Sequence, residues 1–202
     1  QETHNRELFK KLRPGQSYSA RLENKELAGP LGLLTEEGLL RGVGESARDI
    51  ADSIEAMRSL EVSQVRAMSF VPQKGTPLQS WKEAGPLLEI MTIAVLRLVF
   101  PDRLIPATLD VEGLTGLQSR LEAGANVVTS LVPPGFGLAG VAQNSLDIAD
   151  ARRTIASIVP ELEKLGLQAA SLEDYSTWIE DRRQQIRRRL ASHQPGFDQL
   201  GR

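Results

Sequence analysis

The sequence predicts an α/β fold in which parallel strands alternate with helices. Short runs rich in β-branched residues are separated by longer segments whose apolar residues recur at helical spacing. The connections between strands are too long for hairpins, and such alternation implies right-handed crossovers and a parallel sheet. Four strands that begin after an orphan helix fit either a small open sheet or the second half of a TIM-type (β/α)8 barrel.

The first 60 residues predict two short helices, a strand and a longer helix. Proline and glycine end each short helix, and a serine before the second can accept hydrogen bonds from its free N–H groups. The strand runs into a glycine turn, and the helix after it buries Ile50, Ile54 and Met57 on one stripe. The predicted elements are helices over 5–12 and 17–27, a strand with its turn over 37–44, and a helix over 45–60.

The remaining residues continue the alternation. The segment 87–100 is strongly apolar and long enough for a helix packed on a sheet, and Pro101 ends it. Pro160 lies inside an amphipathic segment and is expected to end or kink its helix. The predicted elements are strands over 64–71, 104–110 and 126–132, and helices over 87–100, 114–123, 149–166 and 171–192.

The composition excludes several classes of function. The chain has 202 residues, 41% hydrophobic and 25% charged, so it can bury a core. The net charge is only -2, and no basic cluster is interleaved with aromatic residues, so nucleic acid is not expected as a partner. No apolar run reaches membrane-spanning length, and the first residues lack the apolar core of a secretory signal, which predicts a cytoplasmic location. The chain does not start with methionine, which indicates that it begins inside a longer one.

Cysteine is absent from the chain, and the two histidines stand far apart in the sequence. These residues alone therefore form no disulfide, thiolate nucleophile or cysteine-ligated zinc or iron–sulfur site. No cluster of metal ligands is visible in the sequence either.

The end of the third predicted strand is the first candidate site. Pro106, Thr108 and Asp110 share one parity of this strand, so a hydroxyl and a carboxylate project on one side of it. The carboxyl ends of strands are where α/β proteins place their chemistry. Thr108 and Asp110 are therefore candidate binding residues.

Arg66 is the second candidate, because it lies within a strand whose two faces are expected to be covered. Burial of a guanidinium costs several kcal/mol unless an anion meets it. One interpretation is a structural pair with an acidic residue such as Asp110. The other is a clamp in which Arg66 takes a ligand carboxylate and Asp110 takes its ammonium, which together describe an α-amino acid site.

Other polar residues carry weaker signals. The turn Gly42-Val43-Gly44 opens a helix, so its N–H groups could meet an anion, although such glycines usually serve only the turn. Pattern alone gives no function to Glu2 or Arg21. The arginine-rich segment 180–189 is interpreted as a solvated helix end, with a docking surface as the minor alternative, and Trp81 and Trp178 as packing residues.

Six blocks of the sequence carry a resemblance to a known family: QET at 1–3, KLRPGQS at 11–17, FVPQKGTPL at 70–78, LRLVFP at 96–101, RLIPATLDVEG at 103–113 and AGANVVTS at 123–130. They resemble the second half of the methylornithine synthases, which are radical S-adenosylmethionine (SAM) mutases of pyrrolysine biosynthesis. The resemblance extends over about residues 1 to 165 without large gaps. Biotin synthases and hydrogenase maturases are also similar to the chain at its start and at IPAT (105–108). The continuation LDVEG (109–113) favours the mutases.

The resemblance implies a fold and a set of site residues. It assigns residues 1–165 to the second half of a radical SAM barrel, from the end of strand four onward, and residues 166–202 to a C-terminal helical extension. Family positions that hold the amino-acid part of SAM match Glu2 and Arg21. The pattern beside the adenine matches Gly38, Leu40, Gly42 and Glu45, with leucine in place of isoleucine. The substrate pair matches Arg66 and Asp110, and Thr108 stands where the family usually has serine.

The resemblance also implies a reaction: SAM is cleaved reductively, hydrogen is abstracted from L-lysine, and (3R)-3-methyl-D-ornithine is formed. The chain departs from the family in one respect that bears on this reaction: the CxxxCxxC loop that binds the 4Fe-4S cluster is absent from it. We therefore expect the chain alone to be inactive and to need a missing N-terminal half of the barrel as its partner. The alternatives are another radical SAM enzyme of the biotin synthase or hydrogenase maturase type, or a non-catalytic half-barrel binding module. A half-barrel exposes strand edges, so dimerisation or poor solubility is expected.

Overall fold

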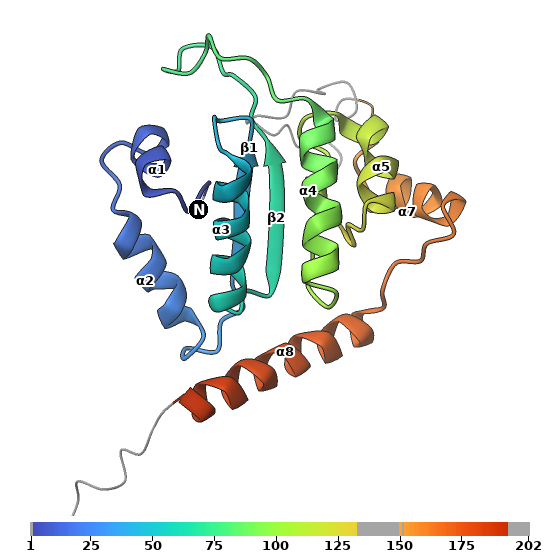
Figure 1. Ribbon diagram of the computed structural model, residues 1–202. Coiled ribbons are helices and arrows are strands. Elements are labelled where there is room, and N and C mark those ends of the chain that lie inside the picture. The colour runs from blue at the N-terminus through green and yellow to red at the C-terminus, as the bar shows by residue number, and fades with distance from the viewer. Residues whose placement is uncertain (1, 133–149, 151, 194–202) are drawn as a thin grey trace, which may run out of the picture.

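The computed structural model describes residues 2–132, 150 and 152–193 of the chain. Helices and strands alternate along the chain as the sequence predicts (Figure 1). The elements are α1 (Arg6–Leu12), α2 (Tyr18–Ala28), β1 (Glu36–Arg41), α3 (Ala47–Ser59), β2 (Gln64–Ser69), α4 (Pro86–Val99), β3 (Pro106–Thr108), η1 (Gly113–Gly116), α5 (Leu117–Glu122), β4 (Val127–Thr129), α7 (Ile155–Lys164) and α8 (Leu172–His193).

The four strands are parallel, which confirms the predicted topology. β1 pairs with β2 over six residues, and β3 pairs with β4 over three. A parallel bridge between Gln64 and Leu104 joins the two pairs, and the Val65 N–H donates to the Leu104 carbonyl over 3.0 Å. The strands therefore follow one another in chain order, as two two-stranded sheets that are joined by this bridge.

The start of the chain lies along the other edge of β1. The Leu40 N–H donates to the Glu2 carbonyl over 2.9 Å, and the Thr3 side chain is buried. Asn5 then caps α1, because its side chain accepts hydrogen bonds from the N–H groups of Glu7 and Leu8. Residues near the N-terminus are thus held beside the middle of the first strand.

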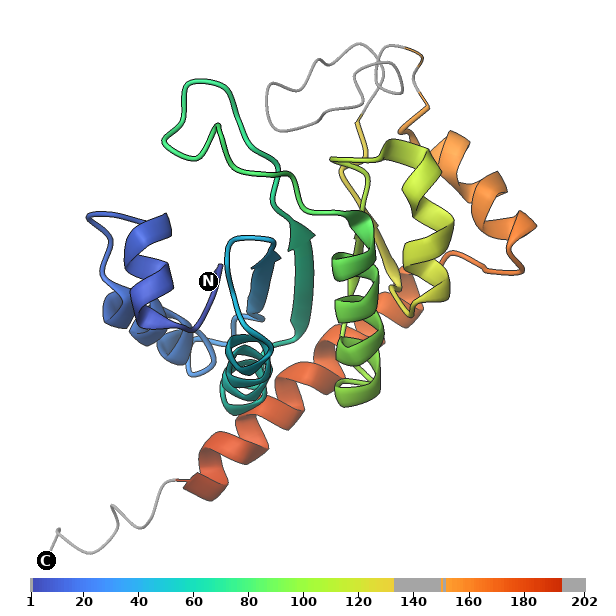
Figure 2. The same ribbon diagram turned by 45° about the horizontal axis from the view of Figure 1, so that its top comes forward.

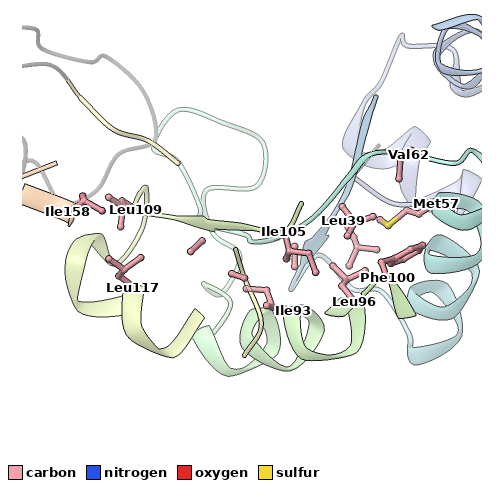
Figure 3. Packing of buried hydrophobic residues seen from close by; sticks show 14 residues of the cluster. Leu39, Met57, Val62, Ile93, Leu96, Phe100, Ile105, Leu109, Leu117 and Ile158 are labelled. Carbon is pink, nitrogen blue, oxygen red and sulfur yellow. The ribbon is translucent and has the colours of Figure 1, made fainter. Parts of the chain in front are cut away.

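One face of the strands packs against the helices and forms the core. Leu39, Val65 and Ala107 alternate along this face with residues of the opposite face, as period-two strands require. Figure 3 shows the buried side chains as one continuous row between strands and helices. Ile93 and Leu96 of α4 are fully buried in this row, and each such side chain contributes about 2 kcal/mol.

The opposite face of the strands is more polar and less covered. Leu40, Arg66 and Met68 are only half-buried there, while their neighbours in sequence are buried against the helices. Such a face points to the interior of a barrel when further strands close the sheet. The polar candidates of the sequence lie on this face or at its upper rim.

Helix α8 crosses the end of the molecule where the strands begin (Figures 1 and 2). Arg182 is 2% exposed and donates through Nη2 to the Glu61 carbonyl over 3.1 Å. The interpretation of the arginine-rich segment as a solvated helix end is therefore wrong for Arg182, because α8 docks on the chain before β2. Trp178 anchors the same helix, since its Nε1 donates to the Asp102 carbonyl over 3.2 Å.

The boundaries of α7 differ from the prediction. The helix begins at Ile155 after the Thr154 cap, and the predicted start at 149 lies outside the described residues. Pro160 does not end the helix, which continues to Lys164. Ile158 and Leu162 pack against the core on either side of the proline, and their burial offsets the missing backbone hydrogen bond. Among the described residues, no helix combines the length and apolarity needed to cross a membrane.

A buried ion pair ties the helices to the upper ends of the strands. The Arg120 side chain on α5 is 1% exposed, and its Nε lies 2.6 Å from Glu89 Oε1 on α4, which is fully buried. Ser69, the last residue of β2, donates through Oγ to the other Glu89 oxygen over 2.7 Å. Each charge of the pair is therefore compensated by the other.

We expect Glu89→Ala to lower the free energy of unfolding by on the order of 3 kcal/mol, because it leaves the buried Arg120 charge without its closest partner. Urea unfolding followed by circular dichroism measures this. The control is Glu55→Ala, which breaks an exposed pair with Arg58 on α3 and should leave stability within error of the wild type. Equal effects of the two substitutions would contradict the structural role of the buried pair.

Candidate functional site

Thr108 and Asp110 meet at the end of β3, as their strand parity predicts. The Thr108 hydroxyl donates to Asp110 Oδ2 over 2.9 Å, and Ser130 Oγ lies 3.3 Å from the same hydroxyl. Thr108 is buried and Asp110 is half-buried. A carboxylate and two hydroxyls therefore gather beyond the carboxyl ends of β3 and β4.

Arg66 makes the predicted pair with an acidic residue, but its partner is Glu36 of the neighbouring strand and not Asp110, the example that the sequence suggested. The Arg66 Nε lies 2.6 Å from Glu36 Oε1, and Gln64 also donates to the Glu36 carboxylate. The reason is register: Gly38 is opposite Arg66, and Glu36 lies two residues earlier on the same face of β1. A Cβ at Gly38 would lie 3.2 Å from Arg66 Cβ, so the glycine leaves room beside the arginine.

The pair with Glu36 leaves part of the Arg66 guanidinium without a hydrogen bond. Glu36 engages Nε and Nη2, and Nη1 has no hydrogen-bond partner among the described residues. The side chain is 23% exposed, so a ligand can reach it. Arg66 on β2 and Asp110 after β3 form no hydrogen bond or ion pair with each other in the described part of the chain, although their strands are neighbours.

Glu2 has one carboxylate oxygen bound and the other free. Arg13 donates through Nε to Glu2 Oε1 over 2.8 Å, whereas Oε2 is buried and accepts no hydrogen bond from the described residues. Burial raises the pKa of Glu2, but the hydrogen bond and charge of Arg13, together with the charge of Arg21, lower the pKa below its usual value. An anionic oxygen without a donor fits a ligand ammonium group.

Arg13 was not among the residues predicted from the sequence, although it lies within the KLRPGQS block. Arg21 is half-buried on α2 and donates to Gln16 Oε1 over 2.7 Å. Its guanidinium also lies 5.6 Å from the centre of the Phe9 ring. The charge of Arg21 contributes to the lowered pKa of Glu2.

The glycine turn after β1 does not present its first N–H groups to a ligand. The N–H groups of Gly42 and Val43 donate to the two Glu45 oxygens over 3.0 and 2.8 Å. The hypothesis of an external anion at these two groups is therefore wrong, because a carboxylate of the chain already occupies them. Gly42 has a φ of +88°, and a Cβ there would lie 2.5 Å from Ala84 Cβ, so the turn needs glycine.

A buried polar cluster that the sequence did not indicate lies beside this region. The Lys25 ammonium of α2 is 3.0 Å from Glu37 Oε2 on β1, and His4 Nε2 is 4.0 Å from the same oxygen. Burial lowers the pKa of His4 to about 4, and the charge of Lys25 adds to the effect. The cluster fixes α2, and hence Arg21, against the first strand.

No group of three or more histidine, aspartate or glutamate side chains that could hold a metal ion occurs among the described residues. The full chain also lacks cysteine. A cluster ligated by thiolates is therefore not supplied by this chain.

The chain has parallel strands, flanking helices and polar groups at the carboxyl ends of the strands. These features identify it as part of a β/α barrel. A solved structure of this class, described as methylornithine synthase (PylB), superposes on the chain with a TM-score of 0.81 at 42% identity. The match covers 88% of this chain and 52% of the solved one. The predicted fold, part of a TIM-type barrel, is confirmed.

Comparison with curated proteins gives a more particular result. The 3-methylornithine synthase of Methanosarcina acetivorans is 43% identical over 177 residues, which is 88% of this chain and 51% of that protein. The enzyme of the same name from Methanosarcina barkeri is 43% identical over 175 residues. The hydrogenase maturase subunit HydE of Thermotoga maritima is 32% identical over 130 residues. No family model matches the chain.

These matches confirm the resemblance to the methylornithine synthases. The chain spans about half the length of the two synthases it matches. That coverage agrees with the predicted correspondence to the C-terminal half.

The buried histidine predicts a pH dependence of stability. His4 has a pKa of about 4 in the folded chain and about 6.5 when unfolded, so the unfolded state takes up the proton first as the pH falls. The contribution of neutral His4 is fully present above pH 6.5 and is lost as the pH falls toward 4. Between pH 7 and pH 5 we expect a loss of about 2 kcal/mol.

Urea unfolding of the wild type and of His4→Phe at the two pH values isolates this contribution. The variant should lose less stability than the wild type by this amount, since phenylalanine does not titrate. An identical pH dependence of the two proteins would show that His4 is not held neutral by burial.

Proposed function

We propose that this chain is the substrate-binding half of a radical SAM isomerase that converts L-lysine to (3R)-3-methyl-D-ornithine in pyrrolysine biosynthesis. The observation that carries the proposal is the similarity to two 3-methylornithine synthases over nearly nine-tenths of the chain. Arg66 and Asp110, the candidate amino-acid clamp, lie on one side of the strands within the matched half.

The clamp suits an α-amino acid, which carries a carboxylate and an ammonium group on one carbon atom. Arg66 has a guanidinium edge available for a carboxylate, and its orientation is fixed by Glu36. Asp110 can accept hydrogen bonds from an ammonium group, with the Thr108 hydroxyl beside it. Holding both groups orients the reacting carbon chain and keeps fragments of the substrate close enough to recombine.

The residues near the N-terminus fit the amino-acid part of SAM. Glu2 Oε2 is a buried anionic oxygen without a donor, and the ammonium group of SAM would satisfy it. Arg21 supplies a positive charge for the carboxylate of SAM, and the expected adenine position is beside Leu40 on β1 and Gly42, which follows this strand. When bound, SAM would supply the radical chemistry that the side chains of this chain lack.

The 4Fe-4S cluster does not fit this chain, because the chain has no cysteine to ligate it. The cluster would therefore have to be held by residues outside this chain. The chain alone is proposed to be inactive, and its partner is the other half of the barrel, which would carry the cluster loop.

A different radical SAM chemistry is the competing proposal. Its support is the similarity to HydE of Thermotoga maritima and to the biotin synthase of Thermodesulfovibrio yellowstonii, at 32% and 31% identity. Those matches cover 63% and 48% of this chain, against 88% for the first synthase. A half-barrel that only binds its ligand is the non-enzymatic alternative.

We expect Arg66→Ala to weaken L-lysine binding by the 202-residue chain at least about tenfold, because a charge-assisted hydrogen bond to the carboxylate is lost. Nuclear magnetic resonance titration measures the affinity. Cadaverine, which lacks the carboxylate, should lose no affinity in the variant, because it makes no ion pair with Arg66. Arg48→Ala, a substitution in an exposed ion pair of α3, is the control. Unchanged lysine affinity in Arg66→Ala would contradict the clamp.

A further inference from the structure

We propose that Arg120 is a positioning residue that sets the separation of the two sides of the amino-acid clamp. The inference rests on the proposed function and deepens it. Arg120 lies on α5, and among the described residues it makes no hydrogen bond or ion pair with Arg66 or Asp110. It acts on both through the segments that carry them.

On one side, Arg120 fixes the loop that follows Asp110. Its Nη1 lies 2.8 Å from Glu112 Oε2, and Glu112 comes two residues after Asp110. The same Nη1 donates to the Gly116 carbonyl over 3.0 Å, so the guanidinium holds both ends of the turn between β3 and α5. This contact gives a role to Glu112, which lies in the LDVEG block and has no place in the clamp itself.

On the other side, Arg120 fixes the end of the strand that carries Arg66. Its Nε contacts Glu89 Oε1, and Glu89 Oε2 accepts a hydrogen bond from Ser69, the last residue of β2. Ser69 follows Arg66 by three residues on the same strand. One buried guanidinium is thus linked to the segments of both candidate clamp residues.

The surroundings leave Arg120 little freedom to move. Its side chain is 1% exposed, and the two carboxylates together with its hydrogen bonds raise its pKa despite burial, so it stays charged. A Cβ on Gly116 would lie 2.0 Å from its Nη1, so the turn fits closely around the guanidinium. A rigid link of this kind can hold binding groups at a fixed distance.

The test breaks one of two contacts at a time, Arg120–Glu112 or Ser69–Glu89, and leaves the buried Arg120–Glu89 pair intact. Glu112→Gln weakens the contact that fixes the loop after Asp110, and Ser69→Ala removes the contact that fixes the end of the Arg66 strand. The controls are Glu122→Gln, on the exposed end of α5, and Ser59→Ala, on the exposed end of α3. Binding of L-lysine, 6-aminohexanoate and cadaverine to each form of the 202-residue chain is measured by nuclear magnetic resonance titration.

The three ligands report separately on the two sides of the clamp, because 6-aminohexanoate lacks the α-ammonium group and cadaverine lacks the carboxylate. We expect Glu112→Gln to reduce the preference for lysine over 6-aminohexanoate about fivefold, and Ser69→Ala to reduce the preference for lysine over cadaverine about fivefold. A merely structural role would lower the melting temperature without changing either preference.

Two results would overturn the inference, and they are distinguishable. If the wild type prefers lysine over both analogues and neither variant changes these preferences, Arg120 does not position the clamp, while the proposed function stands. If the wild type shows no preference for lysine over the analogues, the proposed amino-acid clamp fails, and the positioning role fails with it.

Discussion

The burial of one arginine charge constrains much of this structure. Taking the Arg120 guanidinium out of water costs several kcal/mol, and only close carboxylates offset that cost. Glu89 of α4 and Glu112 of the turn after β3 supply them, and Ser69 of β2 completes the hydrogen bonding of Glu89. Two helices, a strand end and a turn must therefore keep their relative positions if the charge is to stay compensated.

The two faces of the strands have different roles: one stabilises the fold and the other carries the candidate binding residues. The helix-covered face holds the apolar side chains that stabilise the fold, while the opposite face carries Glu36, Arg66 and Thr108. Polar groups on such a face are tolerable because they pair along and between strands, as Arg66 does with Glu36. The same pairing orients them for a ligand, so the requirements of folding and of binding agree here.

Local pattern predicted the elements and part of the site. Alternating periodicity gave the strands and helices in order, and strand parity placed the hydroxyl of Thr108 beside the carboxylate of Asp110. What failed depended on contacts between distant segments. The partner of Arg66 is set by the register of β1 against β2, and the burial of Arg182 by the docking of α8, and neither is encoded in local spacing. The contact of Glu45 with the glycine turn is local in sequence. A carboxylate three residues after Gly42 can accept hydrogen bonds from the free N–H groups of the turn.

In the proposed enzyme, this chain binds the substrate and the other half of the barrel supplies the cluster chemistry. Joining the chain to the N-terminal half of the Methanosarcina barkeri 3-methylornithine synthase and supplying SAM, reductant and labelled L-lysine tests this division of roles. We expect labelled methylornithine from the joined protein and none from the 202-residue chain alone. Product from the chain alone, or a folded joined protein that binds SAM and lysine without forming product, would contradict it.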